Sequence, residues 1–334
     1  MLESGISTMI NDIKKTDDTS EMIKVDEALE LVKQEVDRTL SKSPLVIREY
    51  TKHLTGSHGK FIRAVSVIIS AENNEGLVHP NAIKIAAAIE ILHLATLVHD
   101  DIIDNADLRR GDITLQKKYG KRTAVICGDY LLSVSLRMAA SIKNKKEFFD
   151  LELPDYVGKV CLGELNQHIN NANLNLTIYR YLKIISGKTA ALFEASFFAG
   201  AIFSGISEAE TKKYKKLGNY IGMIFQLTDD CIDFENTVET ANKPVQSDFE
   251  QGVVTLPLIH ALEVLKDFKA KAEKVGITRS EINEAVAKTE GISFTRMVVQ
   301  KYYNKSMKII NDLELTESKK TKLISILNKA SRLS

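Results

Sequence analysis

The chain has 334 residues, 44% of them hydrophobic, and a formal net charge of +1 at pH 7. This is enough apolar material for one large core, although length alone also allows two domains. The balanced charge gives no indication of a nucleic-acid partner, and the three cysteines lack metal-ligand spacing and suit a reducing cytoplasm.

Residues 1–24 are polar and lack the apolar run of a signal peptide, so we expect an extension ahead of one domain at 25–334. Nowhere do eighteen apolar residues follow one another, which argues against a transmembrane segment. Sustained alternation of apolar and polar residues is missing, and Ser207–Glu210 and Thr278–Glu281 have the spacing of capping boxes at helix starts. We therefore predict an all-α fold, a single-domain helical bundle around a central cavity.

The first candidate binding residues are Lys60 and Arg63, which are three positions apart and so share a helix face. Arginine binds phosphate through a planar fork and lysine as a mobile point charge, so a phosphate site can use both. Considered singly, each is more often an ordinary surface cation, and the same alternative holds for the basic residues that follow.

Residues 83–98 are almost entirely apolar, which predicts a buried helix. Among the exceptions, His93 and Thr96 fall within about 40° of Asp100 around a helix. A polar stripe on a buried helix needs a cavity or a ligand to face. His93 alone would be interpreted as a hydrogen-bonded core histidine, but its alignment with the aspartates favours ligand binding.

Asp100, Asp101 and Asp104 follow this apolar segment. On a helix their positions fall within an arc of roughly 100°, so the three carboxylates point the same way. Such a cluster repels itself unless cations neutralise it, and Mg²⁺ typically takes one or two carboxylates plus substrate phosphates. A calcium loop is disfavoured, because an EF-hand needs glycine at its sixth position, where Asn105 stands.

The same spacing recurs at Asp229, Asp230 and Asp233, again after an apolar, helix-compatible segment. Gln226 lies within about 60° of Asp229 around that helix, so it faces the same side. A single acidic match is often a solvated surface helix, but two copies in the same setting argue against that interpretation. Two such clusters facing each other would form a clamp for Mg²⁺ and diphosphate.

Further short motifs accompany the two clusters: Arg109-Arg110-Gly111, Gly128-Asp129, Gly163-Glu164, Gly187-Lys188-Thr189, Lys243 and Thr255-Leu256-Pro257. In this order, and together with Lys60, Arg63 and His93, they resemble the motifs of the trans-isoprenyl diphosphate synthases, also called polyprenyl synthetases. The resemblance runs from about residue 25 to the C-terminus. One aspartate motif alone would be weak, whereas the whole ordered set is specific.

The resemblance implies a prenyltransferase that condenses isopentenyl diphosphate head to tail, 1′-4, with an allylic diphosphate. It implies Mg²⁺ as the cofactor, held by Asp100, Asp104, Asp229 and Asp233, with Asp101 and Asp230 as further ligands or as supporting carboxylates. Isopentenyl diphosphate would be held by Lys60, Arg63, His93 and Arg110. The allylic diphosphate would contact Arg109, Lys188, Thr189, Gln226 and Lys243. The residues expected to be catalytic are Asp100, Asp104, Lys188, Asp229 and Asp233.

Several positions depart from the family pattern, among them Phe61, Ala64 and Asn242. Val253 is the most consequential, because many members have a lysine there, two residues before the threonine that corresponds to Thr255. One cation beside the diphosphate is therefore missing. Lys243 or basic residues near the C-terminus would have to take over its task.

Product length is expected to depend on Ala95 and Thr96, which lie about one helical turn, roughly 5.4 Å, below the aspartates. In the family, bulky aromatic residues at this level resemble a floor that stops growth near farnesyl. Both residues here are small, so we expect a product longer than geranylgeranyl, of the type used for quinone side chains. Alternatively, Ala95 only allows close helix packing and a floor lies lower, near residues 132–138; a short-chain farnesyl or geranylgeranyl synthase is the second interpretation.

Two other functional classes are disfavoured. A terpene cyclase usually carries an Asn/Ser/Glu metal triad on its second helix and needs no isopentenyl site. A non-catalytic partner subunit would be expected to have lost aspartates, and none is missing here. A diphosphate hydrolase would use similar metals, and an assay for carbon–carbon bond formation distinguishes it. The resemblance also implies a homodimer, with a heteromeric partner subunit as the alternative.

Overall fold

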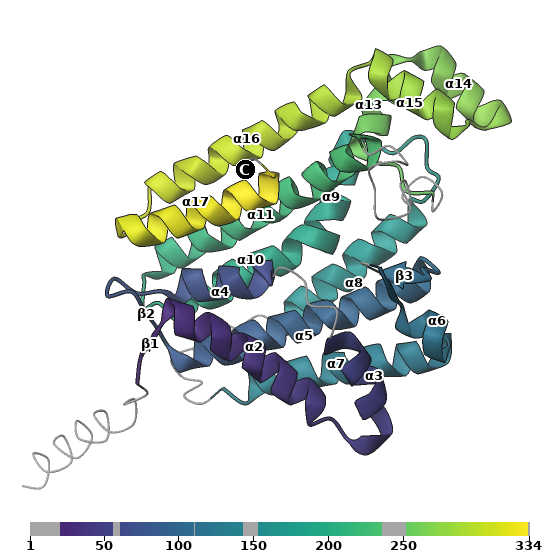
Figure 1. Ribbon diagram of the computed structural model, residues 1–334. Coiled ribbons are helices and arrows are strands. Elements are labelled where there is room, and N and C mark those ends of the chain that lie inside the picture. The colour runs from purple at the N-terminus through teal and green to yellow at the C-terminus, as the bar shows by residue number, and fades with distance from the viewer. Residues whose placement is uncertain (1–20, 56–60, 110, 143–152, 236–251, 333–334) are drawn as a thin grey trace, which may run out of the picture.

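The computed structural model describes residues 21–55, 61–109, 111–142, 153–235 and 252–332, and it is almost entirely helical (Figure 1). The helices are α2 (Val25–Ser41), α3 (Leu45–Thr55), α4 (Ile62–Ala71), α5 (Pro80–Ile103), α6 (Leu115–Tyr119), α7 (Lys121–Ala140), α8 (Leu153–Ile169), α9 (Ile178–Ile185), η1 (Ser186–Ala190), α10 (Ala191–Ile202), α11 (Glu208–Glu235), α13 (Leu256–Val264), α14 (Lys266–Val275), α15 (Arg279–Lys288), α16 (Gly291–Asn311) and α17 (Glu317–Ser331). The predicted all-α fold is confirmed.

The only strands among the described residues are two-residue pairs. Strand β1 (Ile23–Lys24) runs antiparallel to β2 (Leu77–Val78), which fastens the start of α2 beside the start of α5. Strand β3 (Leu108–Arg109) pairs antiparallel with β4 (Asp112–Ile113) directly after α5. This second pair turns the chain back, so that Arg109 returns toward the end of α5.

The two helices that carry the aspartate clusters are also among the longest, with 24 residues in α5 and 28 in α11. Helix α5 starts at Pro80, a favourable first position because proline lacks only an N–H that has no partner there. The ring of His79 accepts a hydrogen bond from the Asn81 backbone and caps the same end. Helix α10 packs against both α5 and α11, and so links the two aspartate-bearing helices.

The core consists of three apolar clusters. One joins α2, α4, α5, α7 and α10, the second joins α9, α13 and α15, and the third joins α10, α11, α16 and α17. Close packing of α10 against α11 depends on Gly218, where an added Cβ would lie 2.7 Å from the carbonyl oxygen of Phe193. Apolar residues therefore surround α10 on all sides, which fits its largely buried sequence.

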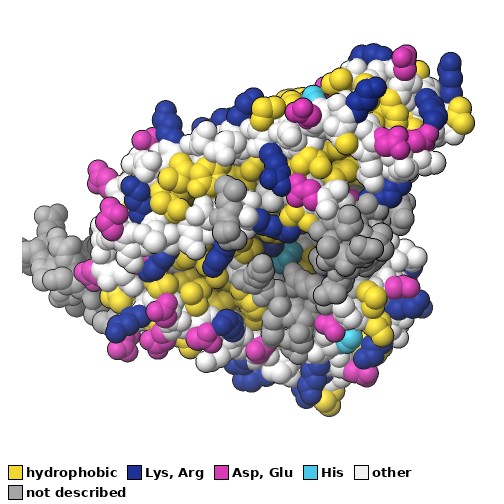
Figure 2. All heavy atoms as spheres, turned by 45° about the horizontal axis from the view of Figure 1, so that its top comes forward, with side chains coloured by type: hydrophobic (Ala, Val, Ile, Leu, Met, Phe, Trp, Pro, Cys, Tyr) yellow, Lys and Arg dark blue, Asp and Glu magenta, His cyan; other side chains and the backbone are white. Residues whose placement is uncertain are grey.

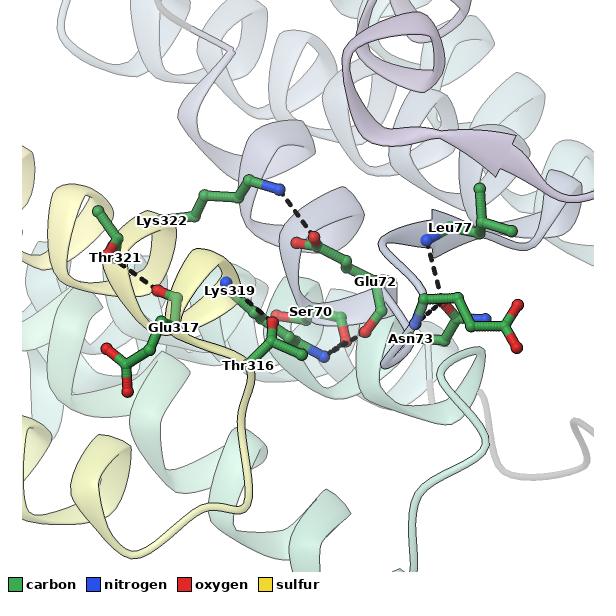
Figure 3. A network of polar contacts seen from close by, with 10 residues as sticks. Ser70, Glu72, Asn73, Leu77, Thr316, Glu317, Lys319, Thr321 and Lys322 are labelled. Carbon is green, nitrogen blue, oxygen red and sulfur yellow. Dashed lines mark hydrogen bonds and ion pairs between the residues drawn. The ribbon is translucent and has the colours of Figure 1, made fainter.

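Helix α17 is fastened to α4 by a buried polar contact (Figure 3). The Lys319 ammonium group donates to the backbone oxygens of Ser70, at 3.1 Å, and Glu72, while Lys322 pairs with the Glu72 carboxylate at 2.7 Å. Burial lowers the pKa of Lys319 to about 8, against the opposing charges of Glu72 and Glu210. These contacts satisfy carbonyl groups at the end of α4, which helix geometry leaves without a partner.

Two described helices, α5 and α7, are long and apolar enough to cross a membrane by length and composition alone. This differs from the expectation drawn from uninterrupted apolar runs, because mean hydropathy tolerates isolated polar residues. In α5 the most apolar window is 67% buried, as in the core helix of a globular protein, and in α7 it is 33% buried. Two such helices are weak evidence for a membrane protein.

Candidate active site

The first aspartate cluster lies where α5 ends. Asp100 and Asp101 belong to its last turn. Asp104 caps the helix, with its backbone N–H donating to the Asp100 carbonyl, and the N–H of Asn105 donates to the Ile102 carbonyl. Asp101 is 6% exposed, and its carboxylate accepts a 2.7 Å hydrogen bond from Nε of Arg109. Arg109 therefore neutralises the second aspartate, whereas Asp100 and Asp104 are half-buried and interact electrostatically with Lys188.

Burial has a large effect on this cluster. It raises the pKa of Asp100 to about 7, with a further upward contribution from Glu164 and opposing contributions from Lys188 and Arg109. The pKa values of Asp101 and Asp104 are raised too, again chiefly by burial. The cluster is thus unfavourable as a set of free anions, and a cation that binds it would remove that penalty.

Lys188 is the basic residue of helix η1 that faces the first cluster. It forms an ion pair with Glu164 at 2.9 Å. Burial alone would lower the pKa of Lys188, but Glu164, Asp100 and Asp104 outweigh it and raise that pKa. The ammonium group therefore stays charged among these three carboxylates.

The position of Lys188 depends on a close crossing of α8 and η1. An added Cβ on Gly163 would lie 2.3 Å from the backbone nitrogen of Lys188, and one on Gly187 would lie 3.1 Å from Cα of Gly163. Only glycine fits at such a crossing. The Gly163-Glu164 and Gly187-Lys188 motifs are therefore two sides of one contact. Helix η1 is a π-helix, a form often found at functional sites, and the sequence analysis did not predict it.

The next residue, Thr189, faces the second cluster. Its hydroxyl donates to Oε1 of Gln226 at 2.7 Å, and Nε2 of Gln226 donates to Oδ1 of Asp230 at 2.9 Å. The hydroxyl of Tyr181, on α9, donates to the other oxygen of Asp230. Asp230 is 1% exposed, and each of its two carboxylate oxygens accepts one of these hydrogen bonds. As in the first cluster, the second aspartate is held by protein groups.

Tyr181 was missed by the sequence analysis. It is 2% exposed, and a buried tyrosine hydroxyl usually has a hydrogen-bond partner. It also precedes Lys188 by seven residues, which is about two helical turns and therefore nearly the same face. That spacing was the available signal, but it does not identify Asp230 as the partner.

We expect Tyr181→Phe to lower the free energy of unfolding by about 1–3 kcal/mol, because one oxygen of the buried Asp230 carboxylate loses its donor. The measurement is the denaturant midpoint at an unchanged slope. Tyr179→Phe is the matched control, since Tyr179 is on the same helix and 75% exposed. Equal midpoints for the two variants would contradict this role of Tyr181.

Asp229 and Asp233 are the other two aspartates of the second cluster. Asp229 is 53% exposed and accepts a 2.8 Å hydrogen bond from Nη2 of Arg332, at the end of α17. Asp233 lines a small cleft with Val253, Thr255 and Arg279. Val253, where many family members have a lysine, therefore lies beside an aspartate of the cluster.

Of the basic and polar residues predicted to hold isopentenyl diphosphate, Arg63 and His93 are described. Arg63 is buried at the start of α4, with its guanidinium 4.7 Å from the centre of the Phe193 ring. His93 is half-buried, and its Nδ1 lies 3.5 Å from the Thr96 hydroxyl. Lys60, Arg110 and Lys243 lie outside the described residues. In the space-filling view, basic and histidine side chains lie among apolar ones in a hollow of the face below α16 and α17 (Figure 2).

The Gly128-Asp129 motif supports the first cluster from α7. An added Cβ on Gly128 would lie 2.3 Å from the His99 ring, and Nε2 of His99 lies 3.3 Å from Oδ1 of Asp129. His99 directly precedes Asp100, so this contact fixes the last turn of α5 against α7. The motif therefore positions a helix end and needs no ligand to explain it.

The donor set suits Mg²⁺ that is bound together with a phosphate ligand. Asp100 and Asp104 on one side, and Asp229 and Asp233 on the other, are hard oxygen donors. Among the described residues, no group of three or more His, Cys, Asp or Glu side chains is close enough to hold a metal by itself. Mg²⁺ typically takes one or two carboxylates and completes its coordination with substrate phosphates and water.

The chain is similar in sequence and in structure to known proteins over most of its length. A family model described as polyprenyl synthetase matches residues 44–290. Heptaprenyl diphosphate synthase component 2 of Bacillus subtilis (strain 168) is 35% identical over 291 residues, which cover 85% of this chain and 82% of the relative. Octaprenyl diphosphate synthase of Escherichia coli (strain K12) is 34% identical over 226 residues, covering 67% and 68%. The crystal structure of heptaprenyl diphosphate synthase from Staphylococcus aureus superimposes with a TM-score of 0.84 at 33% identity, covering 93% of this chain and 98% of the other.

Proposed function

The chain belongs to the polyprenyl synthetase family, and from that premise we propose that it condenses isopentenyl diphosphate with an allylic diphosphate, repeatedly and with Mg²⁺. It is a prenyltransferase and a polyprenyl diphosphate synthase. The observation that carries the proposal is the pair Lys188 and Thr189. These consecutive side chains face the first and the second aspartate cluster, respectively, so one backbone segment joins the two halves of a diphosphate site.

The side chains have separable roles in this reaction. Asp100 and Asp104 on one side, with Asp229 and Asp233 on the other, would hold Mg²⁺, which supplies positive charge to the departing diphosphate when bound. Lys188 adds a charged donor at the same place, kept in position by Glu164. Arg109 and Tyr181 hold Asp101 and Asp230, and so orient the helix ends that carry the other aspartates.

Departure of the diphosphate leaves an allylic cation, and the double bond of isopentenyl diphosphate attacks it. A proton is then lost from the adduct, and the released diphosphate is a sufficient base. Arg63 and His93, with Lys60 and Arg110, are proposed to orient the isopentenyl diphosphate, and Arg109, Thr189, Gln226 and Lys243 the allylic side. Positioning and electrostatic stabilisation therefore account for catalysis without a side-chain nucleophile.

The direct test is incubation with radiolabelled isopentenyl diphosphate, each allylic primer and Mg²⁺, followed by sizing of the dephosphorylated products. We expect labelled chains longer than geranylgeranyl, of the kind that quinones carry, and loss of product on chelation. The names of the heptaprenyl and octaprenyl relatives support this length. Products that stop at farnesyl or geranylgeranyl would assign a short-chain synthase. Diphosphate release without a carbon–carbon bond would overturn the proposed reaction.

Arg63→Ala is expected to raise the Michaelis constant for isopentenyl diphosphate about tenfold and to leave that for the primer nearly unchanged. A contact that binds the substrate and the transition state equally well affects the Michaelis constant rather than turnover. Arg63 is buried against Phe193, so Arg63→Lys is needed to separate loss of charge from loss of packing. Lys33→Ala, at an exposed ion pair with Glu30, is the control. Equal increases for both substrates would contradict the assignment of Arg63 to one diphosphate.

The assembly proposed here is a homodimer. Exposed apolar side chains gather on two neighbouring helices, Val125 and Ile126 on α7 and Leu162, Leu165 and Ile169 on α8. Exposed apolar groups of this kind mark interfaces between proteins. The relative named component 2 supports a heteromeric partner as the alternative. Light scattering of the active protein distinguishes the two, and a stable active monomer would reject both.

Three free cysteines support a cytoplasmic location.

A further inference from the structure

The two aspartate clusters obtain their neighbouring positive charge differently. The first cluster has Lys188 and Arg109 beside it, from η1 and β3. Beside the second cluster, the loop residue Val253 is apolar. Among the described residues, two cations that lie there, Arg332 and Arg279, come from the C-terminal helices. Both are arginines, whose planar forks can bind a carboxylate or a phosphate with two donors at once.

Arg332 lies directly on Asp229. Its Nη2 is 2.8 Å from Oδ1 of the carboxylate, and the two side chains are 49% and 53% exposed. An ion pair this exposed contributes little to stability. Helix α17, which carries Arg332 at its C-terminal end, is held at its other end by buried Lys319 and by Lys322. The helix thus presents an arginine to a carboxylate that, under the proposed function, must also accept Mg²⁺.

Arg279 is beside Asp233, the third aspartate of the second cluster. It is the first residue of α15 and lines the same cleft as Asp233 and Val253. A complete capping box fixes this helix start: the Thr278 hydroxyl accepts from the Glu281 backbone, and the Glu281 carboxylate accepts from the Thr278 backbone at 2.8 Å. The Arg279 side chain is half-buried, and the helix start that carries it is fixed by this capping box.

We propose that Arg332 and Arg279 are the diphosphate-binding cations of the second aspartate cluster. Arg332 neutralises Asp229 in the metal-free protein and turns to a diphosphate oxygen when Asp229 binds a metal ion. Arg279 binds the same diphosphate from the Asp233 side and supplies the charge that Val253 does not. The inference rests on the proposed function, because it assigns residues to the allylic diphosphate within that site.

The test uses calorimetric titration of the full chain with Mg²⁺ alone and then with inorganic pyrophosphate at saturating Mg²⁺. We expect Arg332→Ala and Arg279→Ala each to weaken pyrophosphate binding about tenfold, as for the loss of one charge-assisted hydrogen bond. Arg332→Ala should also bind Mg²⁺ alone more tightly, because a competing cation has left Asp229. Lys329→Ala on α17 and Lys288→Ala on α15 are matched controls, since both lysines are exposed. Melting temperatures equal to that of the unmodified protein verify the fold.

Pyrophosphate affinities of both arginine variants within twofold of the controls would overturn the proposal, and a loss in only one variant would overturn the assignment of the other arginine. Weaker binding of Mg²⁺ alone by Arg332→Ala would overturn its role as a competing cation. A different result would overturn the proposed function and not the arginine assignment: the unmodified protein binds pyrophosphate through these arginines but forms no labelled condensation product.

Discussion

Asp100→Asn and Asp229→Asn are each expected to abolish condensation, with a loss of at least about 10³-fold in kcat, while the chain stays folded. An amide is a weaker ligand for Mg²⁺ than a carboxylate and carries no charge, so the departing diphosphate loses stabilisation where its charge develops. Asp107→Asn is the control: Asp107 is close to the cluster in sequence but exposed and paired with Lys117. Turnover within tenfold of the unmodified enzyme at saturating Mg²⁺ would reject the metal assignment.

Asp100→Asn also has an expected effect on stability. The pKa of Asp100 in the folded protein is raised to about 7, so ionisation between its ordinary value and 7 favours the unfolded chain. Stability of the metal-free protein should therefore fall as pH rises through this range, and the asparagine variant should not show that loss. We expect a higher melting temperature than the unmodified protein at pH 8 without metal, and a smaller gain on adding Mg²⁺ and pyrophosphate. A lower melting temperature at pH 8 would contradict the role of burial.

Thr96→Phe is expected to shorten the product by one or more isoprene units. Thr96 is half-buried, its hydroxyl is 2.8 Å from the His93 carbonyl oxygen, and it lies on the same side of α5 as Asp100. A phenyl ring at this level would occupy the space into which the chain must grow. The measurement is the size distribution of dephosphorylated products, and Thr96→Val is the size-matched control. An unchanged distribution would reject this mechanism of length control.

Ala95→Phe provides a contrast with Thr96→Phe. Ala95 is 2% exposed and belongs to the apolar cluster that joins α5 to α2, α4, α7 and α10. Around the helix it is about 140° from Asp100, so a ring there meets the core first. We expect a destabilisation of about 1–3 kcal/mol from overpacking. A product that shortens with Ala95→Phe and not with Thr96→Phe would show that the channel follows the other face of α5.

Helix periodicity was sufficient to predict the all-α fold and to align His93 and Thr96 with Asp100, because periodicity fixes which residues share a face. It could not assign partners. Nothing in the spacing distinguished Asp101 and Asp230, which bind Arg109 and Tyr181, from the other four aspartates of the two clusters. That difference depends on β3 and α9, which approach from other parts of the chain.

The glycine motifs illustrate the same limit. Gly163 and Gly187 were recognised only as members of an ordered set of motifs, whereas their physical role is a contact between two helices that are distant in sequence. The π-helical turn at Lys188 could not be predicted either; it packs against α8 and α11, whose positions helix periodicity does not give. Basic residues near the C-terminus were expected as a group to compensate for Val253. Arg332 and Arg279 could not be named individually, because each is an ordinary basic residue until its neighbour is known.

The shared backbone of Lys188 and Thr189 has a consequence for substrate binding. A shift of η1 that moves the ammonium group toward Asp100 and Asp104 also moves the hydroxyl that holds Gln226 and, through it, Asp230. Ligand occupancy at one cluster is thereby linked to the geometry of the other. Linkage is reciprocal. If a diphosphate bound at the first cluster changes the ligand affinity of the second cluster by some factor, a ligand bound at the second cluster changes the diphosphate affinity of the first by the same factor.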